Sequence, residues 1–230
     1  MKESWRSVFL LLILTGCFAC TAPKKEEKEA KKHVVERALG VSEEGRPLYA
    51  PCKACHGDYG QGNPKLGAPA LANTDGWYIY RQLMNFRKGI RGSAPADTLG
   101  VQMAAMAAIL KDSIAVGHVV AFLESLPEAP IQNTIKGDIK KGERTYQSTC
   151  GSCHGPQGKG NEAMNAPRLN GLDDWYLKRQ VLNFKNSLRG SHPQDLYGAQ
   201  MVPMATLLKD DQSINDVIVY IRSATGANGE

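Results

Sequence analysis

The sequence predicts an all-α protein made of two tandem copies of one helical module. Two observations support this prediction. The sequence matches itself when it is shifted by 98 residues, a shift that places Cys52 on Cys150 and His56 on His154. Apolar residues recur at helical spacing in both copies, and no segment alternates polar and apolar residues over the length of a strand. The expected modules span residues 41–127 and 136–227, joined by a linker over residues 128–135.

Three helices are expected in each module. In the middle helix of the first copy, Ile79, Leu83 and Phe86 recur at the spacing of one helical face. The segments between the helices are long and rich in glycine and proline, which is natural when loops wrap a cofactor. The predicted helices cover residues 43–50, 77–88 and 115–125 in the first module and residues 139–148, 175–186 and 214–223 in the second.

The N-terminal segment is typical of an export signal. A lysine and an arginine precede an apolar run over residues 8–14, which is far shorter than the ~20 apolar residues of a membrane-spanning helix. The tetrapeptide Leu-Thr-Gly-Cys that ends at Cys17 resembles the lipobox of bacterial lipoproteins. That resemblance implies a signal peptide over residues 1–16 and lipid attachment at Cys17. The alternative is an ordinary signal that is cleaved near Ala22.

The next segment, residues 17–40, is charged and has too few apolar residues to build a core. We therefore expect a solvated tether that holds the folded part near a membrane. The whole chain carries a formal net charge of +5, with basic and acidic residues mixed. It has no basic stripe with interleaved aromatic residues, which argues against nucleic acid as a partner.

Each module contains one Cys-x-x-Cys-His motif, the attachment signature of haem c. Two thiols one helical turn apart can add to the two vinyl groups of one haem, and the adjacent imidazole then binds the iron. A redox disulfide would need a strand–helix context, which the sequence does not predict. A zinc site could use all four thiols, but it would leave the histidine after each pair unexplained. The predicted attachment residues are Cys52, Cys55, Cys150 and Cys153, and the predicted iron ligands are His56 and His154.

The second iron ligand is expected in a loop before the last helix, which can fold over the opposite face of the haem. A pair of methionines stands there in each module: Met103 and Met106 in the first, Met201 and Met204 in the second. A thioether is a soft, neutral ligand that raises the reduction potential of haem iron relative to two imidazoles. Because methionine is also common core filler, one member of each pair is expected to pack in the core.

Further residues repeat at matching positions in both modules, among them Pro69 and Pro167, Tyr78 and Tyr176, Gln82 and Gln180, and Phe86 and Phe184. With the two haem motifs, these residues make each module resemble class I cytochromes c, and the tandem pair resembles the dihaem carriers of the cytochrome c-four type. The resemblance spans roughly residues 42–225. It implies domains of a few helices, each wrapped around one covalently bound haem c. It also implies that the first methionine of each pair, Met103 and Met201, binds the iron.

Two other repeated pairs have alternative roles. Pro69 and Pro167 either brace the proximal imidazole with a backbone carbonyl or form a simple loop turn. Arg91 and Arg189 either pair with the haem propionates or lie solvated at the surface.

The predicted function is single-electron transfer without substrate chemistry, because iron bound by both histidine and methionine has no open position. The expected partners are redox proteins such as a quinol-oxidising complex or a terminal oxidase, in the periplasm or at the outer face of a bacterial membrane. One alternative is a fixed subunit of a membrane oxidoreductase complex. A dihaem peroxidase is a weaker alternative, because such an enzyme needs one open haem and both modules carry the same methionine pair.

Overall fold

The computed structural model describes residues 43–224, and its regular secondary structure is helical. Among these residues no β-strand forms, and sheet-like pairing is limited to isolated bridges between Asn63 and Ala68 and between Asn161 and Ala166. The predicted all-α fold class is therefore confirmed.

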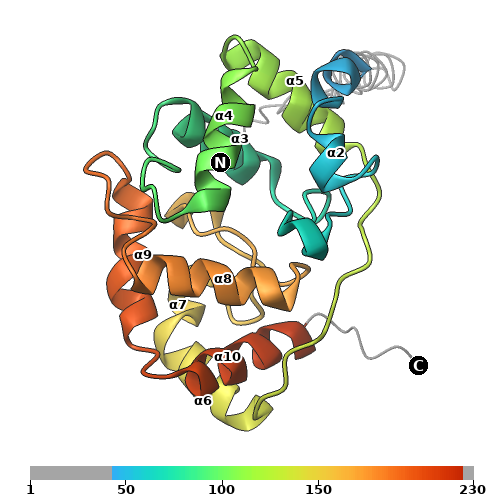
Figure 1. Ribbon diagram of the computed structural model, residues 1–230. Coiled ribbons are helices and arrows are strands. Elements are labelled where there is room, and N and C mark those ends of the chain that lie inside the picture. Colours follow the sequence, from blue (N-terminus) through green and yellow to red (C-terminus); the bar gives the residue numbers. More distant parts are fainter. Residues whose placement is uncertain (1–42, 225–230) are drawn as a thin grey trace, which may run out of the picture. The chain divides into compact units, whose positions relative to one another are not determined.

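The two modules repeat the same order of elements (Figure 1). In the first module, residues 43–49 are helical and are followed by α2 (Lys53–His56), the 3-10 turn η1 (Pro64–Leu66), α3 (Gly76–Arg87), α4 (Thr98–Ala108) and α5 (Ser113–Glu124). The second module contains α6 (Ile139–Thr149), α7 (Gly151–His154), η2 (Glu162–Met164), α8 (Asp174–Lys185), α9 (Leu196–Thr206) and α10 (Asp211–Ser223). The three helices predicted in each module are present, with ends within a few residues of the predicted ones.

The prediction of a loop before the last helix is wrong, because α4 and α9 occupy that segment. Each helix begins after an aspartate, Asp97 or Asp195. Its carboxylate accepts a hydrogen bond from the backbone N–H three residues on, at 3.0 Å in both helices. Glycine inside both helices and Pro203 inside α9 conceal the helical character from a prediction based on composition.

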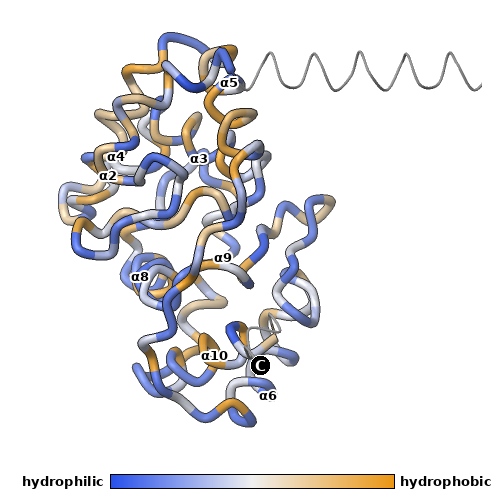
Figure 2. Tube along the Cα trace, turned by 90° about the vertical axis from the view of Figure 1, so that its right-hand side faces the viewer, coloured by the Kyte–Doolittle hydropathy of each residue, from blue (hydrophilic) through white to orange (hydrophobic). Residues whose placement is uncertain are grey.

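Each module has its own hydrophobic core, built around its last helix. The middle and last helices pack together in both modules, as α3 on α5 and as α8 on α10. Hydrophobic stretches run along α5 and α10 (Figure 2). The buried core residues of these two helices include Val116, Val119, Phe122 and Leu123 in the first module and Ile214, Val217, Ile218 and Ile221 in the second.

The first helix of each module crosses the last helix at a glycine. A Cβ atom added at Gly142 of α6 would lie 1.9 Å from the backbone carbonyl oxygen of Asp216 in α10. In the first module, a Cβ atom added at Gly45 would lie 1.9 Å from the backbone carbonyl oxygen of His118 in α5. Only glycine permits two backbones to approach this closely. The two crossings fix the segment that leads into each cysteine motif against the core.

A buried tyrosine connects each of these first helices to the motif. Tyr49 and Tyr146 are 2% and 0% exposed, and their hydroxyls donate to the carbonyl oxygens of Gly57 and Gly155, both at 2.8 Å. The two glycines follow the motif histidines directly and have φ values of 80° and 77°, a conformation that favours glycine. The tyrosine hydroxyl therefore holds the turn that ends each motif.

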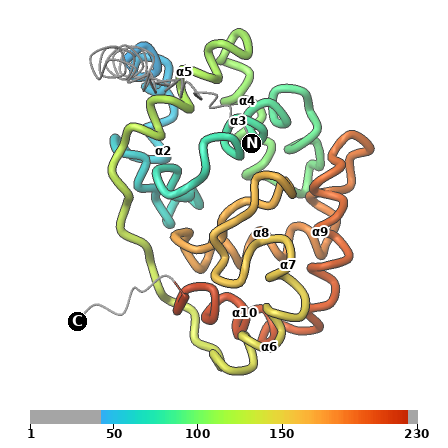
Figure 3. The backbone as a smooth tube through the Cα atoms, turned by 180° about the vertical axis from the view of Figure 1, so that it is seen from behind, coloured from blue at the N-terminus to red at the C-terminus, as the bar shows by residue number. Residues whose placement is uncertain are grey.

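The segment between the modules, residues 127–138, has no regular secondary structure and runs from α5 to α6 (Figure 3). Asp174, which is 1% exposed, accepts hydrogen bonds from the backbone N–H groups of Thr134 and, at 2.6 Å, of Ile135. Asp173 accepts another from the N–H of Gln132 at 2.9 Å. The predicted linker falls inside this segment, and these carboxylates tie it to the start of α8.

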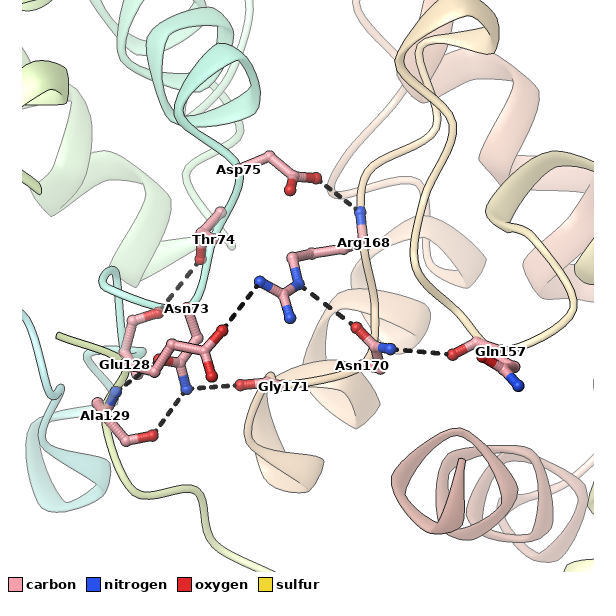
Figure 4. A network of polar contacts seen from close by, with 10 residues as sticks. Asn73, Thr74, Asp75, Glu128, Ala129, Gln157, Arg168, Asn170 and Gly171 are labelled. Carbon is pink, nitrogen blue, oxygen red and sulfur yellow. Dashed lines mark hydrogen bonds and ion pairs between the residues drawn. The ribbon is translucent and has the colours of Figure 1, made fainter. Parts of the chain in front are cut away.

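The loops before α3 and α8 join the two modules by hydrogen bonds that follow the repeat (Figure 4). Asp75 accepts from the backbone N–H of Arg168 at 2.9 Å. At the matching positions, the backbone N–H of Ala70 faces the carboxylate of Asp173 and partly offsets the burial that raises the pKa of that carboxyl. Figure 4 also shows the Asn73 side chain donating to the carbonyl oxygen of Gly171 at 2.8 Å, and an ion pair at 3.4 Å between Arg168 and Glu128 of the linker.

The predicted signal peptide, the lipid-attachment residue Cys17 and the charged tether lie outside the described residues. Within residues 43–224, no single helix is both long enough and apolar enough to cross a membrane. Helices α4 and α5 reach that length and composition only as a pair, and the pair is bent by 110°.

Candidate cofactor sites

The two Cys-x-x-Cys-His motifs form the short helices α2 and α7. In each motif the backbone N–H of the histidine donates to the carbonyl oxygen of the first cysteine, at 2.9 Å from His56 to Cys52 and 3.0 Å from His154 to Cys150. One helical turn therefore brings two thiols and one imidazole together, as the sequence predicts. None of these four motif cysteines takes part in a disulfide.

Both imidazoles are buried, and a proline carbonyl holds each of them. His56 and His154 are 5% and 6% exposed, and their Nδ1 atoms lie 2.9 Å from the carbonyl oxygen of Pro69 and 2.8 Å from that of Pro167. A carbonyl oxygen can only accept, so Nδ1 carries the hydrogen and Nε2 is the nitrogen left free to bind a metal. Burial lowers the pKa of both histidines and favours this neutral ring. The bracing role considered for the two prolines is therefore the one that the structure supports.

Burial also keeps the first cysteine of each motif neutral. It raises the pKa of the Cys52 thiol and raises that of Cys150 to about 11, with a smaller effect from the second cysteine of each motif. In the part of the chain that the structure describes, no group of three or more His, Cys, Asp or Glu side chains is placed to hold a metal ion.

Each motif opens into a large cavity with mainly apolar walls. The cavity at His56 has a volume of about 420 Å³ and the cavity at His154 about 400 Å³. Both volumes fall in the range of cofactor pockets, ~300–1,000 Å³. Both cysteines of a motif line the same cavity as its histidine. The apolar walls include Ile79, Leu110 and Val119 in the first cavity and Leu177, Leu208 and Val217 in the second.

Both methionines of each pair reach the cavity of their own module. Met103 and Met106 of α4 line the first cavity, and Met201 and Met204 of α9 line the second. All four side chains are partly buried. Residues three apart share one face of a helix, which explains why both methionines of a pair border the same cavity. Which member of each pair binds the iron therefore stays a prediction.

Four polar residues line both cavities: Tyr78 and Gln82 of α3, and Tyr176 and Gln180 of α8. The two cavities therefore meet at a wall that both modules build. The sequence identifies these residues as a repeated helix motif, but it does not predict that the two cavities share them. Contacts across the wall join residues as far as 111 positions apart, as from Arg189 to Tyr78.

Arg91 and Arg189 meet at this shared wall. Each arginine donates to the side-chain carbonyl oxygens of both Gln82 and Gln180, at 2.8 to 3.0 Å. Arg189 is 6% exposed and also donates to the Tyr78 hydroxyl. The ion pairs of the described residues include neither arginine, and the Nε atom of each is buried without a hydrogen-bond partner there.

This position at the shared wall contradicts the interpretation of Arg91 and Arg189 as solvated surface residues. Burying a cation costs several kcal/mol unless an anion is supplied. A bound group that carries carboxylates, as haem does in its propionates, would supply that anion at the shared wall.

The residues of each cavity fit one haem c. They offer two thiols for covalent attachment, an imidazole Nε2 and thioether sulfur atoms for the iron, apolar walls for the porphyrin and arginines for the propionates. The fold and these donors define an all-helical protein with two haem c sites. The cytochrome c family signature matches residues 42–127 and 139–225, and the chain belongs to the cytochrome c family. It carries two covalent haem c groups and is a dihaem electron-transfer cytochrome.

Several curated proteins are similar to this chain in sequence. The chain is 31% identical over 177 residues to the thiosulfate dehydrogenase electron acceptor of Stutzerimonas stutzeri (strain A1501), covering 72% of this chain and 76% of that protein. It is 28% identical over 163 residues to cytochrome c4 of Stutzerimonas stutzeri, covering 66% of this chain and 76% of that protein. It is 35% identical over 180 residues to the cbb3-type cytochrome c oxidase subunit FixP of Bradyrhizobium diazoefficiens, covering 76% of this chain and 58% of that subunit.

Solved structures agree with the fold. Reduced recombinant cytochrome c4 from Pseudomonas stutzeri aligns with a TM-score of 0.59 at 25% identity, covering 79% of this chain and 97% of that one. Thiosulfate dehydrogenase TsdBA from Marichromatium purpuratum aligns with a TM-score of 0.61 at 26% identity, covering 78% of this chain and 39% of that one.

Proposed function

We propose that this protein carries single electrons between redox proteins in the periplasm or at the outer face of a membrane, with no substrate chemistry of its own. The observation that supports this most directly is the wall that the two cavities share. Because both cofactor sites border the same four side chains, an electron that enters one module can leave by the other. Both modules offer the same histidine and methionine donors, so neither iron is expected to stay open for a peroxidase reaction.

The proposed roles of the site residues follow the repeat. The thiols of each motif attach the haem, the motif histidine binds the iron on one side, and one methionine binds it on the other side. Iron held by histidine and methionine is a one-electron centre of raised potential. The residues are Cys52, Cys55, His56 and Met103 in the first module and Cys150, Cys153, His154 and Met201 in the second.

The haem count tests the proposed attachment residues. The mass of the denatured protein is expected to exceed that of the polypeptide by two haems, because thioether bonds survive denaturation. The double variant C52A/C55A and its counterpart C150A/C153A should each retain one haem and half of the haem absorbance per chain. A wild-type protein with one covalent haem or none would contradict the proposal.

The proposed partner is a quinol-oxidising complex or a terminal oxidase. The relatives FixP and CcoP are named as subunits of cbb3-type cytochrome c oxidases, and another relative is named as the electron acceptor of thiosulfate dehydrogenase. These names are compatible with two arrangements of one dihaem unit, a separate carrier and a fixed subunit of a larger complex.

Purification separates these two arrangements. A carrier that docks transiently is expected to elute from mild detergent as a single chain, with its electron-transfer rate to an added oxidase falling as salt screens the docking charges. Oxidase chains that stay bound in a constant ratio through several columns would overturn the carrier and support the fixed subunit.

We also propose that Cys17 carries lipid and anchors the protein to a membrane of a bacterial cell. The support is the Leu-Thr-Gly-Cys segment followed by a charged spacer. Cys17→Ser is expected to leave the precursor unprocessed at this site and to abolish labelling by a radioactive fatty acid. Two or more acyl chains anchor a protein firmly, so loss of the lipid should also change membrane fractionation. Unchanged labelling in Cys17→Ser, with Cys20→Ser as the matched control, would exclude the lipid at Cys17.

A further inference from the structure

One arginine of each module reaches into the cavity of the other module. Arg179 of α8 lines the cavity that contains His56, and Arg81 of α3 lines the cavity that contains His154. The two arginines occupy equivalent positions in the repeat. Each arginine is therefore part of one module in the sequence but lines the cofactor cavity of the other module.

Aromatic rings hold both guanidinium groups in place. The guanidinium carbon of Arg81 lies 4.9 Å from the ring centre of Trp77 and 4.7 Å from that of Tyr197. In the other half, Arg179 lies 5.0 Å from the ring centre of Trp175. Ring faces attract cations at these distances. A guanidinium keeps its proton at any physiological pH, so each position holds a permanent positive charge.

Each arginine also contacts the turn that leads to the histidine-bracing proline of the other module. Arg81 donates to the side-chain and backbone oxygens of Asn165, both at 3.0 Å, and Pro167 follows two residues later. Arg179 lies against the equivalent turn at Gly67, where an added Cβ atom would be 2.9 Å from its Nη1. Both turn residues have left-handed backbones, with φ of 56° at Asn165 and 66° at Gly67. The two charges therefore lie at the opposite module's cavity, beside the turn that leads to its bracing proline.

We propose that these arginines act across the modules: Arg179 raises the reduction potential of the haem in the first module, and Arg81 raises that of the haem in the second. This rests on the proposed function, because it requires a redox-active haem in each cavity. Reduction adds one negative charge at the iron, so a fixed positive charge nearby favours the reduced state. The mainly apolar cavity screens this attraction less than water does.

The test measures both potentials of the complete dihaem protein in charge-removing variants. Haem methyl resonances in the NMR spectrum follow the oxidation state of each haem. Through-space contacts to Leu99 or to Tyr197, which line different cavities, assign each haem to its module. R179Q is expected to lower the potential of the haem at Cys52 and Cys55 and to leave the other potential unchanged. R81Q is expected to lower the potential of the haem at Cys150 and Cys153 and to leave that of the first haem unchanged.

Two sets of controls separate charge from structure. R179K and R81K keep the charge but lose the forked guanidinium, so their potentials are expected to return toward the wild-type values. K178Q removes a charge from the residue that directly precedes Arg179 in α8. The ammonium of Lys178 pairs with Asp211 at 2.9 Å, and Lys178 does not line the first cavity. This control should leave the potential of the first haem unchanged.

The outcomes distinguish the inference from the function on which it rests. Two reversible one-electron titrations in the wild type establish the electron carrier regardless of the variants. The cross-module inference is overturned if R179Q and R81Q each shift the haem of their own module, if they shift both haems equally, or if they shift neither. It is also overturned if the lysine variants behave like the glutamine variants.

Discussion

Replacing Gly142 by alanine is expected to lower the free energy of unfolding of the second module by about 2–3 kcal/mol, as overpacking of a well-packed contact does. The added Cβ atom would lie 1.9 Å from the backbone carbonyl oxygen of Asp216 and 3.0 Å from the Cβ atom of Tyr220. Neither the backbone of α10 nor a Cβ atom can rotate out of the way. Helices α6 and α10 would have to separate, which loosens the Tyr146 contact to the haem motif.

The chain offers a matched control for this prediction. Gly117 lies inside α5 and has no neighbouring atom within 4 Å of an added Cβ atom. Gly117→Ala is therefore expected to stabilise the protein by about 0.5–1 kcal/mol, because alanine loses less backbone entropy in a helix. Urea unfolding of the haem-loaded variants, followed by helix signal and haem absorbance, measures both effects. A Gly142→Ala protein as stable as the wild type would show that the crossing can relax.

The helices and motifs that were predicted correctly share one property: their signals are local. The apolar spacing of Ile79, Leu83 and Phe86 lies within a single helix, and each cysteine motif lies within a single turn. Helices α4 and α9 escaped prediction because their start signal is one aspartate and their interiors contain glycine or proline. A glycine inside a helix, such as Gly142, indicates that another helix crosses closely there. The sequence alone does not identify which helix that is.

The residues of the two cofactor sites were likewise predictable where their signals are local. The cysteines, the histidines and the bracing prolines are placed by short segments, with 13 residues from each histidine to its proline. The shared wall depends instead on hydrogen bonds between the modules, such as those from Arg91 to Gln180 over 89 residues and from Arg189 to Tyr78 over 111 residues. Repetition of the arginine, glutamine and tyrosine in both modules is the signal that could have indicated a common site.

The duplication itself explains why the contacts between the modules come in pairs. When two copies of one module meet face to face, a contact from the first copy to the second is repeated in the reverse direction. Asp75 with Arg168 and Asp173 with Ala70 form one such pair, and Arg91 and Arg189 form another through the two glutamines. The two copies differ at some matching positions, such as Gly67 in the first and Asn165 in the second. At these positions the surroundings of the two haems can differ.

Each module offers two methionines as candidates for the second iron ligand. Both methionines of each pair line the cavity of their module, and a buried alanine, Ala107 or Ala205, directly follows the second methionine. The resemblance to dihaem cytochromes places the ligand at the first methionine of the pair. We therefore expect Met103 and Met201 to bind iron, with Met106 and Met204 packing beside the haem.

Met103→Leu and Met201→Leu are each expected to abolish the near-infrared sulfur-to-ferric-iron band of one haem and to lower its potential. Leucine keeps the volume and the apolar character, so the loss reflects the ligand and not the packing. Because methionine ligation favours reduced iron, the reduction equilibrium should fall more than tenfold, which is more than ~59 mV for one electron. Met106→Leu and Met204→Leu are the matched controls and should retain the band. Reversal of this pattern would assign the iron to the second methionine, and four unaffected variants would mean that no methionine ligates and would move the peroxidase alternative ahead of the carrier.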